Sequence, residues 1–164
     1  AGPLVDQSSP YRRRFQSLGG NTRAHSKGFK VNKLADHLFV SSCDGALHDT
    51  RMLDWSKHPI RPDYARTHSR IENSLQLRAT IRAGAYAWPG GYPMYFIAND
   101  GASMCFDCVQ SQYFQCAYSI RHRIDDGWRI IACDINYEDE DCYCEHCNKR
   151  IPSAYGNDET GDAE

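Results

Sequence analysis

The sequence has 164 residues, of which 41% are hydrophobic and 12% aromatic, and its formal net charge at pH 7 is -2. A chain of this length is typical of one domain that can bury a core of its own. No apolar run approaches the ~18 residues that a membrane-spanning helix needs, which argues against a membrane protein.

Positive charge is concentrated at the amino terminus, where residues 1–33 hold seven Lys or Arg residues against the single acid Asp6. Such an arm can neutralise phosphates, so it is a candidate nucleic-acid-binding segment, and a solvated tail that keeps the protein soluble is the alternative. Residues 1–32 show no sustained period and are predicted to be a disordered basic arm, while residues 158–164 form an acidic tail. The candidate nucleic-acid-binding residues are Arg12, Arg13, Arg14, Arg23, Lys27, Lys30 and Lys33.

Order is predicted to begin near Lys33. Residues 34–48 contain a strand pattern, an Asp-Gly turn at residues 44–45 and a short return strand, whereas prolines make residues 51–70 an irregular loop. A helix follows, with Asn73 or Ser74 as its cap and Gly84 at its end. Arg78 and Arg82 are placed to complement the negative end of this helix dipole.

Residues 85–93 contain two prolines and two adjacent glycines, which predict neither a helix nor a central strand. We expect the aromatic rings of this segment to cover the core, and an exposed binding loop is the alternative. Met94 to Ile97 form a strong strand pattern, and residues 99–101 are typical of a hairpin turn. This second hairpin resembles the first, which indicates either a duplicated unit or convergence on a common turn.

The carboxyl half predicts one more helix and one more strand. Apolar residues from Val109 to Ile124 recur at helical spacing, and residues 128–137 form a strand that is apolar on both faces at its middle. We therefore expect this strand to lie centrally in its sheet. The fold class is α+β, a small mostly antiparallel sheet with two helices and a four-cysteine zinc-knuckle site, in a single domain at residues 33–157.

Cysteines give the strongest chemical signal, because seven of the eight lie between Cys105 and Cys147. Two close pairs, Cys105 with Cys108 and Cys144 with Cys147, can place four thiolates around one ion, and this arrangement suits a structural zinc. The 35 residues between the pairs exceed the gap of a compact zinc ribbon, but they hold a helix and a strand that can bring the pairs together. A closed four-cysteine site leaves no position for water, so its role is folding rather than catalysis.

The other cysteines have simpler interpretations. Cys43, Cys116 and Cys133 fit reduced thiols in a core, and Cys142 and His146 are substitute ligands because they flank the second pair. Disulfides are the alternative if the compartment is oxidising. The sequence contains no nucleophile elbow, phosphate loop or zincin helix, so we lean against an enzyme, and a pocket built around the central loop is the enzymatic alternative.

Several runs in residues 77–156, together with the hairpin at residues 38–51, resemble a group of small uncharacterised proteins encoded by bacteriophages and prophages. These runs are residues 77–84, 86–93, 96–102, 134–139 and 149–156, within a match of about residues 33–157. The resemblance implies a phage setting in the host bacterial cytoplasm or the virion. No activity is established for the group, so it implies no catalytic residue.

We therefore expect a small zinc-stabilised phage protein that acts by binding, with nucleic acid or a host protein as its partner. Arg61, Arg66 and Arg70 form a candidate ordered patch beside the basic arm for nucleic acid. The alternative is a virion structural or assembly component whose amino-terminal arm packs on neighbouring subunits. We identify no small-molecule substrate.

Overall fold

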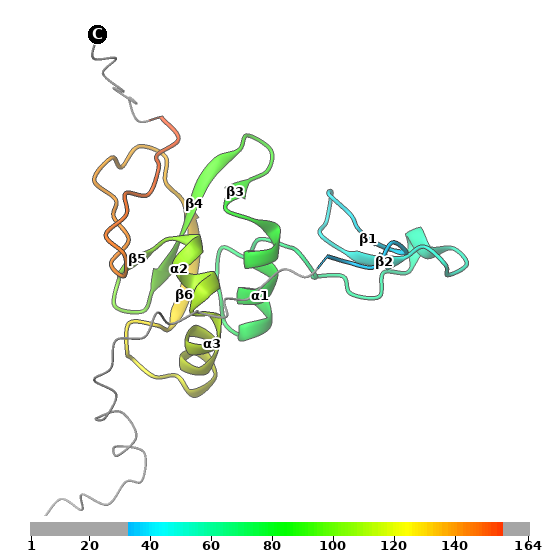
Figure 1. Ribbon diagram of the computed structural model, residues 1–164, viewed down its shortest axis with the longest axis horizontal. Helices are drawn as coiled ribbons and strands as arrows, with labels where there is room; N and C mark the ends of the chain where they lie inside the picture. The colour runs from blue at the N-terminus through cyan, green and yellow to red at the C-terminus, as the bar shows by residue number, and fades with distance from the viewer. Residues whose placement is uncertain (1–32, 156–164) are drawn as a thin grey trace, which may run out of the picture.

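The computed structural model describes residues 33–155. Within this range a hairpin lobe extends away from a body built of helices and a sheet, with α1 (Ser74–Ala83) between them (Figure 1). The helices and antiparallel sheets confirm the predicted α+β class. The predicted arm and acidic tail lie outside the described residues. Within residues 33–155, no helix is long and apolar enough to cross a membrane.

The lobe contains the first predicted hairpin, in which β1 (Leu38–Val40) pairs antiparallel with β2 (Leu47–Asp49). Asp44 Oδ1 accepts the Ala46 N–H at 3.1 Å, as expected of an Asp-Gly turn. Gly45 has φ of 70°, and a Cβ at this position would collide with the carbonyl of Ala65. The turn therefore requires glycine both for its backbone angle and for its closeness to the neighbouring loop.

An aromatic cluster fills the lobe. The Trp55 ring, in the short 3-10 helix η2 (Trp55–Lys57), meets the ring of Phe39 at 5.9 Å and that of His48 at 5.7 Å between centroids. The Nδ1 atom of buried His48 lies 2.8 Å from the Trp55 carbonyl oxygen. These ring contacts join the hairpin to η2, while Phe39 stays 47% exposed.

Helix α1 begins and ends where the sequence predicts. The Asn73 side chain accepts the N–H groups of Leu75 and Gln76, both at 3.0 Å, and thus satisfies two donors of the first turn. At the other end Gly84 has φ of 103°, a conformation that suits glycine. The buried face of the helix consists of Leu77, Ala79, Thr80 and Ile81.

The body's sheet is arranged around β4 (Tyr92–Ala98). Along one edge β4 pairs with β3 (Tyr86–Ala87) and β5 (Ser103–Met104), and along the other with β6 (Ile130–Ile135), always antiparallel. Residues 69–71 add backbone hydrogen bonds to the far edge of β6. Strand β6 thus has neighbours on both sides, while β4 is the hub of the sheet.

The Pro- and Gly-rich segment differs from its prediction. It forms a β3–β4 hairpin, and Tyr92 and Pro93 belong to the central strand. Pro93 is tolerated because it lies near the start of the strand, where the ladder loses little from a missing N–H. The prediction that its rings cover the core is wrong for Trp88, which is 85% exposed at the hairpin tip.

The predicted second helix is two helices, α2 (Phe106–Ser111) and α3 (Tyr113–His122). Ser111 Oγ donates to the Cys108 carbonyl at 2.9 Å, and this carbonyl also accepts the Gln112 N–H. At Gln112 the backbone, with φ of -102° and ψ of 21°, departs from helical geometry, and α3 begins at the next residue. The predicted final strand is β6, which lies between β4 and residues 69–71 as expected of a central strand, although Ile131 on one of its faces is 39% exposed.

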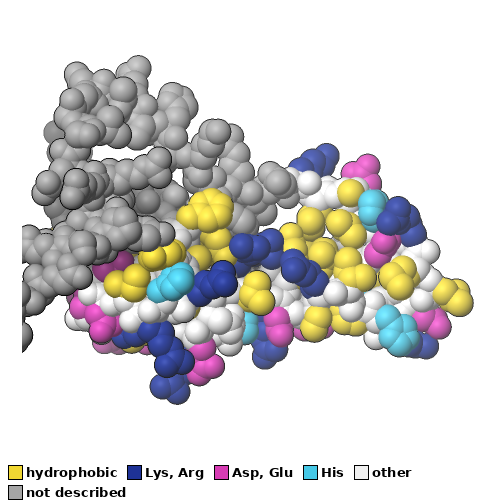
Figure 2. Space-filling model, turned by 90° about the horizontal axis from the view of Figure 1, so that it is seen from below, with side chains coloured by type: hydrophobic (Ala, Val, Ile, Leu, Met, Phe, Trp, Pro, Cys, Tyr) yellow, Lys and Arg dark blue, Asp and Glu magenta, His cyan; other side chains and the backbone are white. Residues whose placement is uncertain are grey.

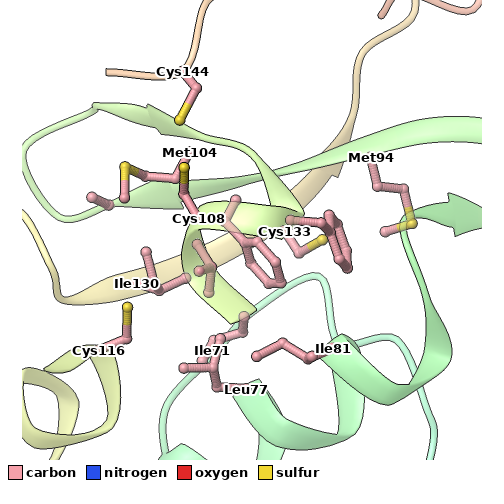
Figure 3. Packing of buried hydrophobic residues seen from close by; sticks show 14 of the residues in the cluster. Ile71, Leu77, Ile81, Met94, Met104, Cys108, Cys116, Ile130, Cys133 and Cys144 are labelled. Atoms are coloured by element: carbon pink, nitrogen blue, oxygen red, sulfur yellow. The ribbon is translucent and has the colours of Figure 1, made fainter. Parts of the chain in front are cut away.

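The core lies between the helices and the sheet (Figure 3). Phe96 of β4 is fully buried and meets the Phe106 ring of α2 at 4.4 Å between centroids. Tyr113 is buried too, and its hydroxyl donates to the Ser74 carbonyl at 3.2 Å. These contacts fix α2, and with it Cys105 and Cys108, against the sheet, and they fix α3 against α1.

Candidate metal centre

The structure brings together the four cysteines that the sequence selects. The sulfur atoms of Cys105, Cys108, Cys144 and Cys147 all lie within 4.8 Å of one another, a grouping that could hold a metal ion. The Cys105 and Cys147 sulfurs are 3.8 Å apart, far beyond the ~2.05 Å of a disulfide. All eight cysteines lie in the described range, and all are free thiols.

The first pair is positioned by the start of α2. Cys105 is the N-cap residue, and its carbonyl accepts the Val109 N–H at 3.1 Å. Cys108 follows within the first turn and is buried. Because the first residues of a helix turn through nearly one full circle, both sulfurs face the same side of the helix end.

The second pair lies on a tight hairpin of residues 142–151, which we call the knuckle. The Ile151 N–H donates to the Cys142 carbonyl at 2.8 Å, and the Cys144 N–H donates to the Lys149 carbonyl at 2.9 Å. The chain reverses through Asn148, whose φ of 54° is left-handed, a conformation that asparagine tolerates. This reversal directs both knuckle sulfurs towards α2.

Three contacts hold the knuckle against the first pair. The Glu145 N–H donates to the Ser103 carbonyl at 2.9 Å, and the Cys105 N–H donates to the Cys144 sulfur at 3.3 Å. On the surface, Lys149 Nζ lies 3.7 Å from Asp107 Oδ2. The long gap is thus closed through the β4–β5 hairpin, and Figure 3 shows the Cys144 and Cys108 sulfurs pointing towards one another.

The cluster favours negative charge on one sulfur. Burial raises the pKa of the Cys144 thiol, but backbone N–H groups of Cys105, Cys147 and His146 outweigh it and bring this pKa to about 7. For Cys108, burial and then the neighbouring thiols Cys105 and Cys147 raise the pKa well above its ordinary value. Without an ion, the lowered pKa of Cys144 favours its thiolate form, which prepares it as a ligand.

The two substitute ligands lie beside the cluster. His146 Nδ1 is 3.2 Å from the Cys108 sulfur, and its ring contacts Trp128 at 5.1 Å between centroids. The histidine is thus placed as a hydrogen-bonding neighbour of a ligand. Cys142 is buried, its sulfur is not one of the grouped atoms, and burial raises its pKa.

Two of the three remaining cysteines occupy the predicted core positions. Cys116 and Cys133 are buried, and burial raises the pKa of each thiol to about 12. The same prediction is wrong for Cys43, which is exposed. It lies in the loop between β1 and β2.

Of the predicted nucleic-acid-binding residues, Arg12, Arg13, Arg14, Arg23, Lys27 and Lys30 lie outside the described residues, and Lys33 is exposed at their edge. The candidate patch is divided by its contacts. Arg66 pairs with Asp63 at 3.3 Å, the backbone of Arg70 bridges to β6, and Arg61 lines a hollow beside α1.

Sequence reasoning missed that two further arginines face this hollow. Arg78 and Arg82 were predicted only as partners of the helix dipole, yet both line the same hollow as Arg61. The sequence feature that could have indicated this is their spacing of four, which places them on one face of α1.

No family model matches the chain, and neither a curated protein nor a solved structure matches it.

Proposed function

We propose that the protein is a small zinc-stabilised, non-enzymatic phage protein that binds nucleic acid. The observation that carries the proposal is the convergence of four cysteine sulfurs within 4.8 Å. A closed site of this kind stabilises a fold, so the working surface of the protein lies elsewhere on the chain.

Sulfur spacing and ligand chemistry support zinc as the metal. A tetrahedral zinc with Zn–S bonds of ~2.3 Å separates its sulfurs by about 3.8 Å. The Cys105 and Cys147 sulfurs already lie 3.8 Å apart, and the full set lies within 4.8 Å. Four soft thiolates in this geometry select zinc over oxygen-preferring cations such as magnesium or calcium.

A structural role follows from the ligand count. Four protein ligands fill the tetrahedron and leave no position at which zinc could activate water. The ion instead joins the start of α2 to the knuckle, and binding free energy at such a site becomes folding free energy.

Nucleic acid is the proposed partner because of the charge distribution. Seven basic residues against one acid in residues 1–33 can contact several phosphates, and exposed Arg61 and Arg70 extend positive charge into the described region. The phage origin, and a place of action in the host cytoplasm or the virion, rest on the sequence resemblance.

A second candidate partner is a protein, either of the host or of the assembling virion. The hairpin lobe supports it, since Leu53 is 91% exposed and Met52 and Ile60 are about half exposed. Apolar side chains gathered on a surface favour contact with another protein. Recovery of the chain as a stoichiometric component of purified phage particles would favour this candidate.

Fluorescence anisotropy of a labelled 20-base-pair duplex tests the nucleic-acid proposal. The zinc-loaded chain should lose affinity steeply between 50 and 300 mM salt, and replacing Arg12, Arg13 and Arg14 by Gln should flatten the slope of log K against log salt by up to about 2.7. A control that replaces Lys57, Arg121 and Arg123 by Gln removes the same charge from other surfaces and should change the slope little. Binding that is absent, or independent of salt, contradicts the proposal.

A further inference from the structure

A hollow of about 380 Å³ lies between the lobe and α1, outside the metal centre. Its walls include the three arginines Arg61, Arg78 and Arg82, together with Tyr64 and His68. Figure 2 shows several Lys and Arg side chains close together near the middle of the face seen there, between the grey atoms and the lobe. The volume is that of a site for a small ligand or a single nucleotide.

The arginines are held in place by the fold. The Arg82 guanidinium lies over the Tyr64 ring, 4.0 Å from its centroid, and Arg78 Nε donates to the Tyr113 hydroxyl at 2.9 Å. The backbone of Arg61 is fixed by the Leu47 N–H, which donates to its carbonyl at 2.8 Å. Because a guanidinium has five N–H donors, these contacts are compatible with further hydrogen bonds to a ligand.

Positive charge accumulates in the hollow. Burial lowers the pKa of Arg82, and Arg78 and Arg61 lower it further by like-charge repulsion, although Tyr64 acts in the opposite direction. The wall contains one carboxylate, Asp63, which pairs with Arg66 at 3.3 Å. An anion between the arginines would relieve this repulsion.

A further polar atom belongs to the same wall. The Nε2 atom of His68 is buried and has no hydrogen-bond partner among the described residues. Its backbone is fixed in turn, because the His68 N–H donates to Thr80 Oγ1 at 3.1 Å. Because this nitrogen is buried from solvent, an oxygen atom of a ligand in the hollow would reach it only after a small movement of the neighbouring side chains.

We propose that this hollow binds a phosphate group, carried either by a nucleic-acid strand or by a small phosphate ester. Three guanidinium groups offer the forked donors that phosphate oxygens match, in a number that exceeds the need of a single carboxylate. Ile60 and Leu75 form an apolar wall for the sugar or base of the ligand. Only the choice of a nucleic-acid strand as the source rests on the proposed function.

The test is a titration of the full zinc-loaded chain, followed by the NMR signals of the arginine Nε–Hε groups. The two probes are inorganic pyrophosphate and a twelve-nucleotide single strand. Pyrophosphate should shift the signals of Arg78 and Arg82, and Arg61→Gln should weaken its binding about fivefold or more because one charged donor group is lost. Arg121→Gln, an exposed arginine on α3 outside the hollow, is the matched control and should change the affinity less than twofold.

The outcomes separate this inference from the proposed function. If pyrophosphate binds as described and the oligonucleotide displaces it, the phosphate belongs to nucleic acid. If pyrophosphate binds but the oligonucleotide neither displaces it nor binds elsewhere, the hollow serves a small phosphate ester and nucleic-acid binding is contradicted. If the oligonucleotide binds without moving the Arg78 and Arg82 signals, and pyrophosphate does not move them either, nucleic-acid binding stands and the phosphate site is overturned. Equal losses in Arg61→Gln and Arg121→Gln would also overturn the phosphate site.

Discussion

Replacing Cys144 by Ser removes one ligand from the proposed zinc site and should destabilise the carboxyl half of the domain. Apparent binding free energies of structural zinc are ~10–16 kcal/mol, so at 1 μM free zinc the ion stabilises the folded chain by about 2–8 kcal/mol. Without the ion, the knuckle keeps its local hairpin, the backbone hydrogen bond from Glu145 to the Ser103 carbonyl and the exposed ion pair of Lys149 with Asp107. We expect Cys144→Ser to lose most of the zinc-dependent part of its unfolding free energy and to unfold first at the knuckle.

Cys142→Ser is the matched control, since this cysteine lies two residues earlier in the same knuckle and is also buried, but outside the sulfur cluster. Urea denaturation with and without a zinc chelator measures the zinc-dependent stability of each protein, and metal analysis gives the zinc content. The chelator should lower the unfolding free energy of the native chain and of Cys142→Ser, and should change that of Cys144→Ser little. A Cys144→Ser chain that binds one zinc and unfolds like the native protein would refute the assignment, and loss of zinc in Cys142→Ser would place the ligand there.

Two further predictions concern the helix cap and the buried thiols. Asn73→Ala should lower the unfolding free energy by about 1 kcal/mol in urea denaturation, because two N–H groups of α1 lose their acceptor. Asn73→Asp should keep most of this stability, because its carboxylate can accept the same hydrogen bonds. Equal losses in both variants would contradict the capping role. The pKa of Cys116 and of Cys133 is raised to about 12 in the folded chain, so above pH ~9 the unfolded chain releases protons that the folded chain retains. Stability should therefore be unaffected by these thiols below pH ~8 and fall as pH rises from ~9, by up to about 1.4 kcal/mol per pH unit for each thiol. Denaturation curves from pH 8 to 10.5 check this, and a Cys116→Ala variant with the same pH slope as the native chain would contradict it.

The parts of the fold that depend on local chemistry could be predicted from the sequence. Asp44 and Asp100 each accept the N–H two residues ahead, which is the turn chemistry that Asp-Gly indicates. Asn73 and Gly84 bound α1 for equally local reasons. The four-cysteine cluster could also be predicted, because the close pairs have few other purposes and the intervening helix and strand allow them to meet.

The parts that depend on tertiary context could not. Pro93 is acceptable in the central strand because it lies near the start of that strand, and Gln112 interrupts a stretch whose apolar spacing is helical throughout. The exposure of Cys43 follows from the projection of the lobe, which hydrophobic patterning does not report. The hollow forms only where the lobe meets α1, so in the sequence Arg61, Arg78 and Arg82 appear only as separate charges.

The most direct test of the central claim is X-ray absorption at the zinc edge on the purified, zinc-loaded chain. Coordination by Cys105, Cys108, Cys144 and Cys147 predicts four sulfur neighbours at about 2.3 Å and no nitrogen or oxygen in the inner shell. A shell with fewer sulfurs and a nitrogen would place His146 among the ligands, and one with a water oxygen would open the site to catalysis. Either result, or a chain that retains no zinc, would contradict a closed structural centre.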